Sequence, residues 1–167
     1  MKFRNFLMVL AVIFIAACNP MEQLGAAEEK IEAFQARYND RDASVLYRMT
    51  GEDFRAATTR EQMDGLVALF SGRLGRIESS ERTGFNSQFK NGLNITTITM
   101  ETQFEQGAGT ETFVFHGTGE DMELVGWTVN SPRLMLSPDE MRMLSEGDQR
   151  ERPDPPERRV VPERSGE

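Results

Sequence analysis

The spacing of the apolar residues changes once along this chain, near Gly75, and this change constrains the fold more than any other feature of the sequence. Before Gly75 the apolar residues recur every three or four positions, and after it they recur at every second position. The first spacing is that of one face of an α-helix, and the second is that of one face of a β-strand. Helices that precede strands, without alternating with them, are typical of an α+β domain. The sequence therefore predicts an α+β fold.

The first expected helix covers residues 21–39. Its apolar side chains follow one another at steps of three and four residues and so share one face: Leu24, Ala27, Ile31, Phe34 and Tyr38. Arg37, near the end of this segment, suits the negative end of the helix dipole. An amphipathic helix is stabilised mainly by covering its apolar face, so we expect this helix to pack on another layer.

Two shorter helices are expected before the spacing changes. Asp42 or Ser44 caps the first of them, and Thr50-Gly51 ends it. Thr59 begins the second, because Gln62 three residues later completes a capping box. The residues of this part that we expect in the core are Phe54, Met63, Leu66, Val67, Phe70 and Leu74.

Four strands are expected after Gly75, joined by three turns. Asn91-Gly92 is the strongest hairpin signal in the chain, because both residues tolerate the left-handed backbone of a two-residue turn. Residues 106–109 and 117–121 are the other expected turns. Short turns join antiparallel strands, so the sequence predicts a meander of about four strands with one face covered by the helices. The strands are expected over residues 76–89, 93–106, 110–116 and 122–130.

The apolar residues of the second expected strand change face along its length. Leu93 and Ile95 share one face, whereas Ile98 and Met100 share the other. An extra residue in a strand produces such a change, so a β-bulge is predicted near Thr96-Thr97.

Trp127 is the only tryptophan of the chain, and it lies between Val125 and Val129 at the spacing of one strand face. Gly126 and Thr128 alternate with these residues and suit the opposite face. Val125, Trp127 and Val129 are therefore predicted to face the helices and to belong to the core.

The first residues of the chain indicate export. Lys2 and Arg4 precede residues 6–17, a run without any charge. A membrane-spanning helix needs about 20 apolar residues, whereas a positive start, a short apolar run and small residues before a break are the pattern of a secretory signal peptide. A buried N-terminal helix is the alternative, but this run is apolar on all sides and stops at residues 18–20.

The tetrapeptide Ile15-Ala16-Ala17-Cys18 resembles the lipobox of bacterial lipoproteins. The resemblance implies cleavage before Cys18 and attachment of a diacylglycerol to its thiol, which would explain the position of the only cysteine in the chain. Two or three acyl chains make a durable anchor where one would be marginal. In bacterial lipoproteins an Asp directly after the acylated cysteine typically retains the protein in the inner membrane, whereas this chain has Asn19 at that position. This implies the periplasmic face of the outer membrane, if the source bacterium has two membranes.

The chain is expected to contain one folded domain between two other segments. Residues 1–17 are the expected signal peptide, and residues 18–23 are the acylated cysteine with a short tether. Residues 24–136 form the α+β domain. Residues 137–167 combine proline and mixed charge with almost no apolar side chains, so they are predicted to be disordered. This tail is either idle or a docking segment for an envelope partner.

The order of helices and strands resembles that of the nuclear-transport-factor-2-like (cystatin-like) domains. The resemblance depends on the first helix, on the Leu74-Gly75 joint and on the strands that contain Phe113, Phe115 and Trp127. It implies a curved sheet that wraps around the first helix as a cone. A hollow cone would have a ligand pocket, for which the candidate residues are Tyr38, Phe113, Phe115 and Trp127; a filled cone would be a scaffold. The family contains enzymes, binding modules and scaffolds, so the fold does not give the function.

Few residues of the sequence suit catalysis or metal binding. His116 is the only histidine, and a metal site or an activated nucleophile usually needs more than one such group. We therefore expect His116 to be an ordinary residue at the end of a strand. A carboxylate in the mouth of a cone can act as acid or base. The candidates are Asp40, Asp42, Glu52 and Asp53, although helix caps and solvated turns explain them better.

The sequence favours a non-enzymatic, lipid-anchored protein of the bacterial cell envelope, without cofactor or metal. Its expected partners are the membrane, through the lipid, and an envelope protein or a small apolar ligand. The alternatives are an accessory subunit of an envelope complex and an enzyme of the isomerase or dehydratase type with a carboxylate in its cavity. A net charge of −8 repels nucleic acid, so no nucleic acid partner is expected.

Overall fold

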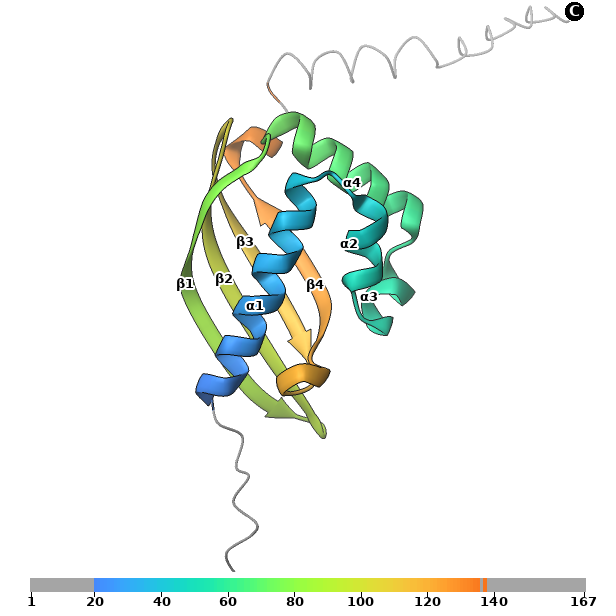
Figure 1. The fold of residues 1–167 in the computed structure, drawn as a ribbon, viewed down its shortest axis with the longest axis vertical. Helices are drawn as coiled ribbons and strands as arrows, with labels where there is room; N and C mark the ends of the chain where they lie inside the picture. Colours follow the sequence, from blue (N-terminus) through green and yellow to red (C-terminus); the bar gives the residue numbers. More distant parts are fainter. Residues whose placement is uncertain (1–19, 136, 138–167) are drawn as a thin grey trace, which may run out of the picture. The chain divides into compact units, whose positions relative to one another are not determined.

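The structure, a computed structural model, describes residues 20–135 and residue 137. The helices come first: α1 (Pro20–Asn39), α2 (Ala43–Met49), α3 (Glu52–Ala57) and α4 (Arg60–Arg73). The strands follow: β1 (Ile77–Lys90), β2 (Leu93–Phe104), β3 (Gly107–His116) and β4 (Glu123–Asn130). Two short 3-10 helices flank β4: η2 (Gly119–Asp121) and η3 (Pro132–Leu134). The predicted α+β fold is confirmed (Figure 1).

Some predictions concern parts of the chain that the structure does not describe. Three predictions lie outside the described residues: the signal peptide over residues 1–17, the acylation of Cys18 and, apart from residue 137, the disordered tail. The predicted tether is shorter than expected, because α1 begins at Pro20 and residues 20–23 form its first turn. Proline suits this position, since its fixed φ fits the helix and the first N–H of a helix has no partner within it.

Local signals set the beginnings of α2 and α4 as predicted. Asp42 Oδ1 accepts a hydrogen bond from the backbone N–H of Val45 at 3.0 Å, and Thr59 and Gln62 form a capping box. The helix α3 was not expected from the sequence. It contains only 6 residues, and a helix this short needs support from the rest of the fold. That support includes the buried side chain of Phe54 in α3 itself.

The strands form one antiparallel sheet in the order β1-β2-β3-β4, which is the predicted meander. Asn91 and Gly92 connect β1 and β2 with φ angles of 54° and 82°, the left-handed backbone that the hairpin signal requires. The turn between β2 and β3 is earlier and tighter than predicted. Phe104 pairs with Gly107, so Glu105 and Gln106 form the turn and residues 107–109 belong to β3.

The predicted β-bulge near Thr96-Thr97 is wrong. β2 pairs with β3 without interruption, and every second residue of β2 from Thr96 to Phe104 is buried. The apolar pattern changes face because a threonine occupies a core position: Thr96 is 0% exposed, and its hydroxyl lies 3.4 Å from that of Ser87. The irregularities lie instead in β1, where residues 78 and 83 are extra in the pairing with β2.

The predicted inner face of β4 is only partly right. Trp127 belongs to the core, and Val129 is partly buried against it. Val125 does not share their register, because Phe115 pairs with Leu124 and Val114 pairs with Gly126. Val125 is thus the extra residue of a β-bulge, and a bulge shifts the following residues to the other face. Leu124, which is 4% exposed, takes the core position that was predicted for Val125.

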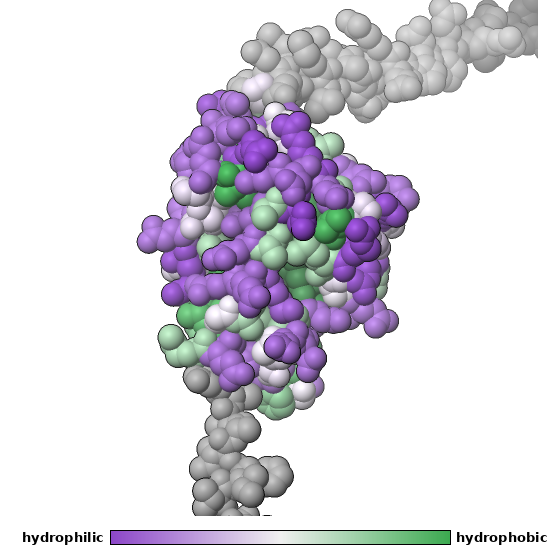
Figure 2. Space-filling model, in the orientation of Figure 1, coloured by the Kyte–Doolittle hydropathy of each residue, from purple (hydrophilic) through white to green (hydrophobic). Residues whose placement is uncertain are grey.

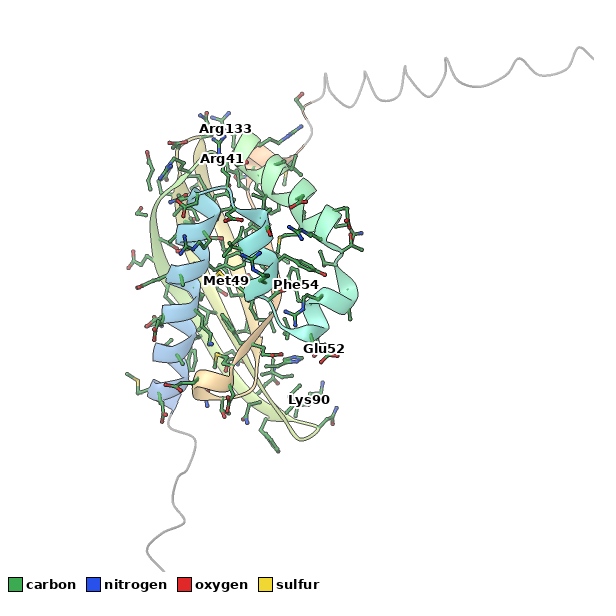
Figure 3. The ribbon with its side chains drawn as sticks, turned by 45° about the vertical axis from the view of Figure 1, so that its right-hand side comes forward. Arg41, Met49, Glu52, Phe54, Lys90 and Arg133 are labelled. Atoms are coloured by element: carbon green, nitrogen blue, oxygen red, sulfur yellow. The ribbon has the colours of Figure 1, made fainter. Side chains whose placement is uncertain are left out.

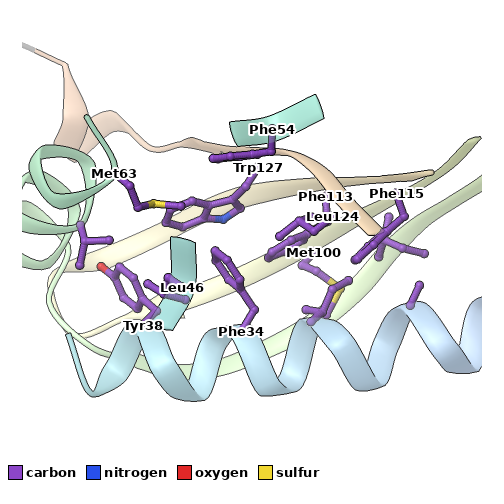
Figure 4. Close-up of a cluster of buried hydrophobic side chains, with 14 of the residues drawn as sticks. Phe34, Tyr38, Leu46, Phe54, Met63, Met100, Phe113, Phe115, Leu124 and Trp127 are labelled. Carbon is purple, nitrogen blue, oxygen red and sulfur yellow. The ribbon is translucent and has the colours of Figure 1, made fainter. Parts of the chain in front are cut away.

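The core lies between α1 and the inner face of the sheet (Figures 1 and 4). Phe34 and Tyr38 of α1 are directed toward Trp127, with ring centroids 5.0 Å and 6.1 Å from that of the indole. Phe70 of α4 contacts the same indole at 5.4 Å. All three pairs have an edge-to-face geometry, which the charge distribution of aromatic rings favours. Trp127 therefore connects the first helix, the last long helix and the sheet.

Candidate functional site

A pocket of about 500 Å³ lies beside α1, at the side where β3, η2 and β4 approach it. Ala26 and Ala33 are two turns apart on the same face of α1, and their small side chains leave space there. The opposite walls are apolar and come from elements far apart in the sequence: Phe113, Phe115, Met122 and Leu124. Phe34 and Met49 complete the apolar lining. Hydrophobic residues reach the surface between α1 and the other helices, within a largely hydrophilic face (Figure 2).

The pocket also has charged residues of both signs. Glu29, Lys30 and Glu120 line it, and Lys30 Nζ donates a hydrogen bond to the backbone carbonyl of Glu120 at 3.2 Å. This bond joins α1 to η2 across one border of the pocket. Most of the remaining lining is apolar, so the pocket suits a small molecule with an apolar body and at most a small polar end.

Two of the four predicted pocket residues lie in this pocket. Phe113 and Phe115 line it, whereas Tyr38 and Trp127 are packed elsewhere in the core. The hydroxyl of Tyr38 donates to the backbone carbonyl of Gly75 at 3.0 Å, and burial raises the pKa of this hydroxyl. The indole of Trp127 fills the space between α1 and α4, as described above. The interior is thus filled around Tyr38 and Trp127 and open beside Phe113 and Phe115.

A buried carboxyl group, which was not predicted from the sequence, lies in the filled part of the core. Glu111 is 0% exposed. Its Oε2 accepts hydrogen bonds from Gln35 Nε2 at 2.6 Å and from Thr102 Oγ1 at 2.8 Å, and its Oε1 accepts one from Trp127 Nε1 at 3.0 Å. Ser80 Oγ lies 3.0 Å from both Gln35 Nε2 and Thr102 Oγ1. Among the described residues, no buried side-chain polar atom is without a hydrogen bond.

The environment of Glu111 acts on its proton affinity in two directions. Burial raises the pKa of this carboxyl, and the hydrogen bonds from Trp127, Thr102 and Gln35 lower it. The net effect is a raised pKa. The alternation of the strand contained a signal for this group, because Glu111 has the same parity as Phe113 and Phe115 and therefore faces the core with them.

The carboxylates that line the pocket, Glu29 and Glu120, are not the candidates that were named from the sequence. Glu111 is not among the described residues that line the pocket. The same holds for Asp40, Asp42, Glu52 and Asp53. Asp40 pairs with Arg37 at 3.2 Å, and Asp42 caps α2. These two are a surface ion pair and a helix cap, as the simpler interpretation of the sequence proposed.

His116 lies at the end of β3, as predicted, and its Nδ1 is 3.0 Å from Asp53 Oδ2. This pair is exposed on the Asp53 side, where 71% of the side chain is accessible. Within the part of the chain that the structure describes, no three His, Cys, Asp or Glu side chains form a group suited to a metal ion.

In residues 20–135 and 137, no helix has the length and apolar character needed to cross a membrane. Comparisons with protein family models, with curated proteins and with solved structures found no match to this chain. The resemblances to bacterial lipoproteins and to nuclear-transport-factor-2-like domains therefore stay predictions from the sequence.

Proposed function

We propose that this chain is a lipid-anchored, non-enzymatic protein of the bacterial cell envelope that binds a small, largely apolar molecule in the pocket beside α1. The observation that carries the binding function is the pocket itself. Its volume of about 500 Å³ lies within the usual range for small-molecule sites, about 300–1,000 Å³. The lipobox at residues 15–18 supports the anchor. It also favours the periplasmic face of the outer membrane as the location, in a bacterium with two membranes.

The residues that form the pocket make a consistent pattern. Large apolar side chains line the sheet side, while two alanines face them from α1. Ala26 is half-buried and Ala33 is exposed, so this side of the pocket is open to solvent and is not part of the core. The two small side chains therefore leave this side of the pocket accessible to a ligand.

The anchor is tested by replacing Cys18. The Cys18→Ser variant is expected to take up no palmitate in metabolic labelling and to accumulate as the unprocessed precursor, because a hydroxyl does not alkylate as readily as a thiolate. The wild-type chain should be labelled and shortened. Equal palmitate incorporation in both chains would exclude acylation at Cys18.

The pocket is tested by filling it. Ala33→Phe should place a ring in the space between α1 and the sheet and weaken binding of an apolar probe by about tenfold or more, or about 1.4 kcal/mol. We would titrate the acylated full-length protein in lipid nanodiscs with N-phenyl-1-naphthylamine. The readout is energy transfer from Trp127, the only tryptophan, because Trp127 contacts Phe34 in the pocket wall.

Ala36→Phe is the matched control for this titration. Ala36 lies on the same helix and is exposed, but it is not among the described residues that line the pocket. The Ala36→Phe variant should bind the probe as the wild type does, with the same background signal from probe dissolved in the lipid. The pocket would not be the binding site if Ala33→Phe and Ala36→Phe gave the same titration curve.

A further inference from the structure

The hairpin between β1 and β2 ends in a tip, residues 89–93, that exposes apolar side chains on both of its faces. Phe89 is 70% exposed and Leu93 is 38% exposed. Phe89 pairs with Asn94, and Lys90 pairs with Leu93. Directly paired residues share a face and neighbours along a strand alternate, so Phe89 and Leu93 lie on opposite faces. Lys90, between them in sequence, is also exposed.

The exposure of the hairpin tip results from the lengths of the strands. β2 begins to pair with β3 only at Ile95, which lies opposite His116, the last residue of β3. Residues 93 and 94 therefore extend past the end of β3 and carry the end of β1 with them. Phe89 is on the same face as Ser87 and Phe85, which lie opposite Thr96 and Ile98 of the core, but it lies beyond the part of the sheet that the core covers.

The hairpin tip lies at the same end of the domain as the beginning of α1. In the first turn of that helix, Gln23 Oε1 accepts a hydrogen bond from the backbone N–H of Gly119 at 3.3 Å. The backbone N–H of Gly117, in the same loop, donates to the carbonyl of Asn94 at the base of the tip, at 3.0 Å. Figures 1 and 3 show the start of α1 and Lys90 at this end. Met21, which is 71% exposed, is here too.

We infer that this end of the domain contacts the bilayer and that the hairpin tip inserts Phe89 and Leu93 among the lipid headgroups. The inference rests on the proposed anchor at Cys18. Cys18 precedes Pro20 by two residues, and consecutive Cα atoms are about 3.8 Å apart, so the anchor and α1 are within about 8 Å. A bilayer that holds Cys18 must therefore lie against the end where α1 begins.

The chemistry of the hairpin tip matches the interface of a zwitterionic phospholipid bilayer. Aromatic and aliphatic side chains bind at the boundary between headgroups and acyl chains, about 5–10 Å deep. Lys90 keeps its ammonium at the level of the phosphates while its methylenes follow the apolar side chains. The net charge of −8 opposes approach to an anionic surface, so the expected lipid surface is neutral overall.

The contact is measurable by depth-dependent quenching in the full-length, acylated protein. Because Cys18 is the only cysteine and acylation blocks its thiol, Phe89→Cys creates a single reactive thiol that can carry bimane. The protein is placed in phosphatidylcholine vesicles that contain a phosphatidylcholine with a nitroxide high on its acyl chain. Emission at position 89 should fall about twofold or more, since the nitroxide lies at the depth of an interfacial side chain.

The control position is Gln106, in the β2–β3 turn at the opposite end of the sheet. Bimane on Gln106→Cys should keep its emission in the same vesicles. The inference would be overturned if the nitroxide lipid changed the emission at positions 89 and 106 equally or not at all. Crosslinking of an unquenched hairpin tip to a second copy of the chain would also overturn it. Palmitate labelling of the same preparation is a separate readout. Its absence refutes the anchor, whereas the quenching ratio alone decides whether the hairpin tip touches lipid.

A charge at the tip gives a second test that leaves the fold intact. With bimane on Leu93→Cys, the further change Phe89→Asp should abolish most of the quenching, because a carboxylate disfavours entry into the headgroup region. Leu69→Asp is the matched control: Leu69 is also exposed, at 47%, but it lies on α4. Quenching that survives Phe89→Asp and Leu69→Asp equally would show that Phe89 does not contribute to the contact.

Discussion

Trp127→Ala is expected to lower the free energy of unfolding by about 3–5 kcal/mol, as truncation of large aromatic residues does in protein cores. The substitution removes two kinds of interaction at this position, and their contributions to stability add up. The indole makes edge-to-face contacts with Phe34, Tyr38 and Phe70, and its Nε1 donates to the buried carboxyl of Glu111. Urea denaturation followed by far-UV circular dichroism measures the loss. In the wild type, the emission of this single tryptophan should be blue-shifted and poorly quenched by acrylamide.

Trp127→Phe separates the two losses. It keeps an aromatic ring in the site and removes the hydrogen bond, so it should cost less than the alanine variant, and the difference between the two reports the packing. A tryptophan that acrylamide quenches freely, together with an alanine variant as stable as the wild type, would contradict a core position for Trp127.

Glu111→Leu is expected to cost about 1–3 kcal/mol for each buried donor that it leaves without an acceptor. The substitution is similar in volume, but it leaves the donors of Gln35, Thr102 and Trp127 without their acceptor. Glu101→Leu in β2 is the matched control, because Glu101 is exposed and its change should stay within about 0.5 kcal/mol. Urea denaturation at neutral pH measures both variants.

A double-mutant cycle with Trp127→Phe tests whether Glu111 acts through this network. The double variant no longer contains the unpaired indole N–H, so its loss should be smaller than the sum of the two single losses. Additive losses would show that the Glu111 carboxyl and the Trp127 indole are energetically independent.

Because the pKa of Glu111 is raised, the free energy of unfolding depends on pH. The folded protein holds this proton more tightly than the unfolded chain, in which the pKa of a glutamate is about 4.3. The stability that this difference contributes is complete below the unfolded pKa and is lost as the pH rises toward the folded pKa. Glu111→Gln carries no charge at any pH. Its stability relative to the wild type should therefore increase as the pH rises above about 4, and a constant difference would contradict the raised pKa.

The sequence by itself determined the parts of the fold that depend on residues close together in the chain. The cap at Thr59 and the turn at Asn91-Gly92 were predicted correctly, and Asp42 is the cap of α2, for which the sequence had left Asp42 and Ser44 open. Each acts through hydrogen bonds or backbone angles within about four residues. The amphipathic face of α1 was also predictable, because the helix itself brings residues three and four apart to one side. The same local signals gave the α+β class and the meander.

The tertiary structure alone decided the register of the strands and the position of α3. Thr96 occupies a core position and Val125 is displaced by a bulge, and neither follows from apolar spacing, because the pairing partner sets the register. The short helix α3 depends on contacts outside itself, among them the hydrogen bond from the N–H of Gly51 to the carbonyl of Leu124, at 2.7 Å. An isolated segment of this length has too few internal hydrogen bonds to offset the entropy of forming a helix.

The candidate site also combines features that the sequence predicted with features that only the tertiary structure shows. The strand pattern identified Phe113 and Phe115 as inward-facing, but the pocket exists because α1 and η2 meet beside them, where Lys30 bonds to Glu120, 90 residues further along the chain. The carboxyl of Glu111 is satisfied by donors from α1, β2 and β4. An isolated glutamate would not be stable in a core, and its partners are distant in sequence. The parity of the strand could place Glu111 on the inner face, but only the folded chain brings these donors together, so only the tertiary structure could show that its carboxyl is satisfied there.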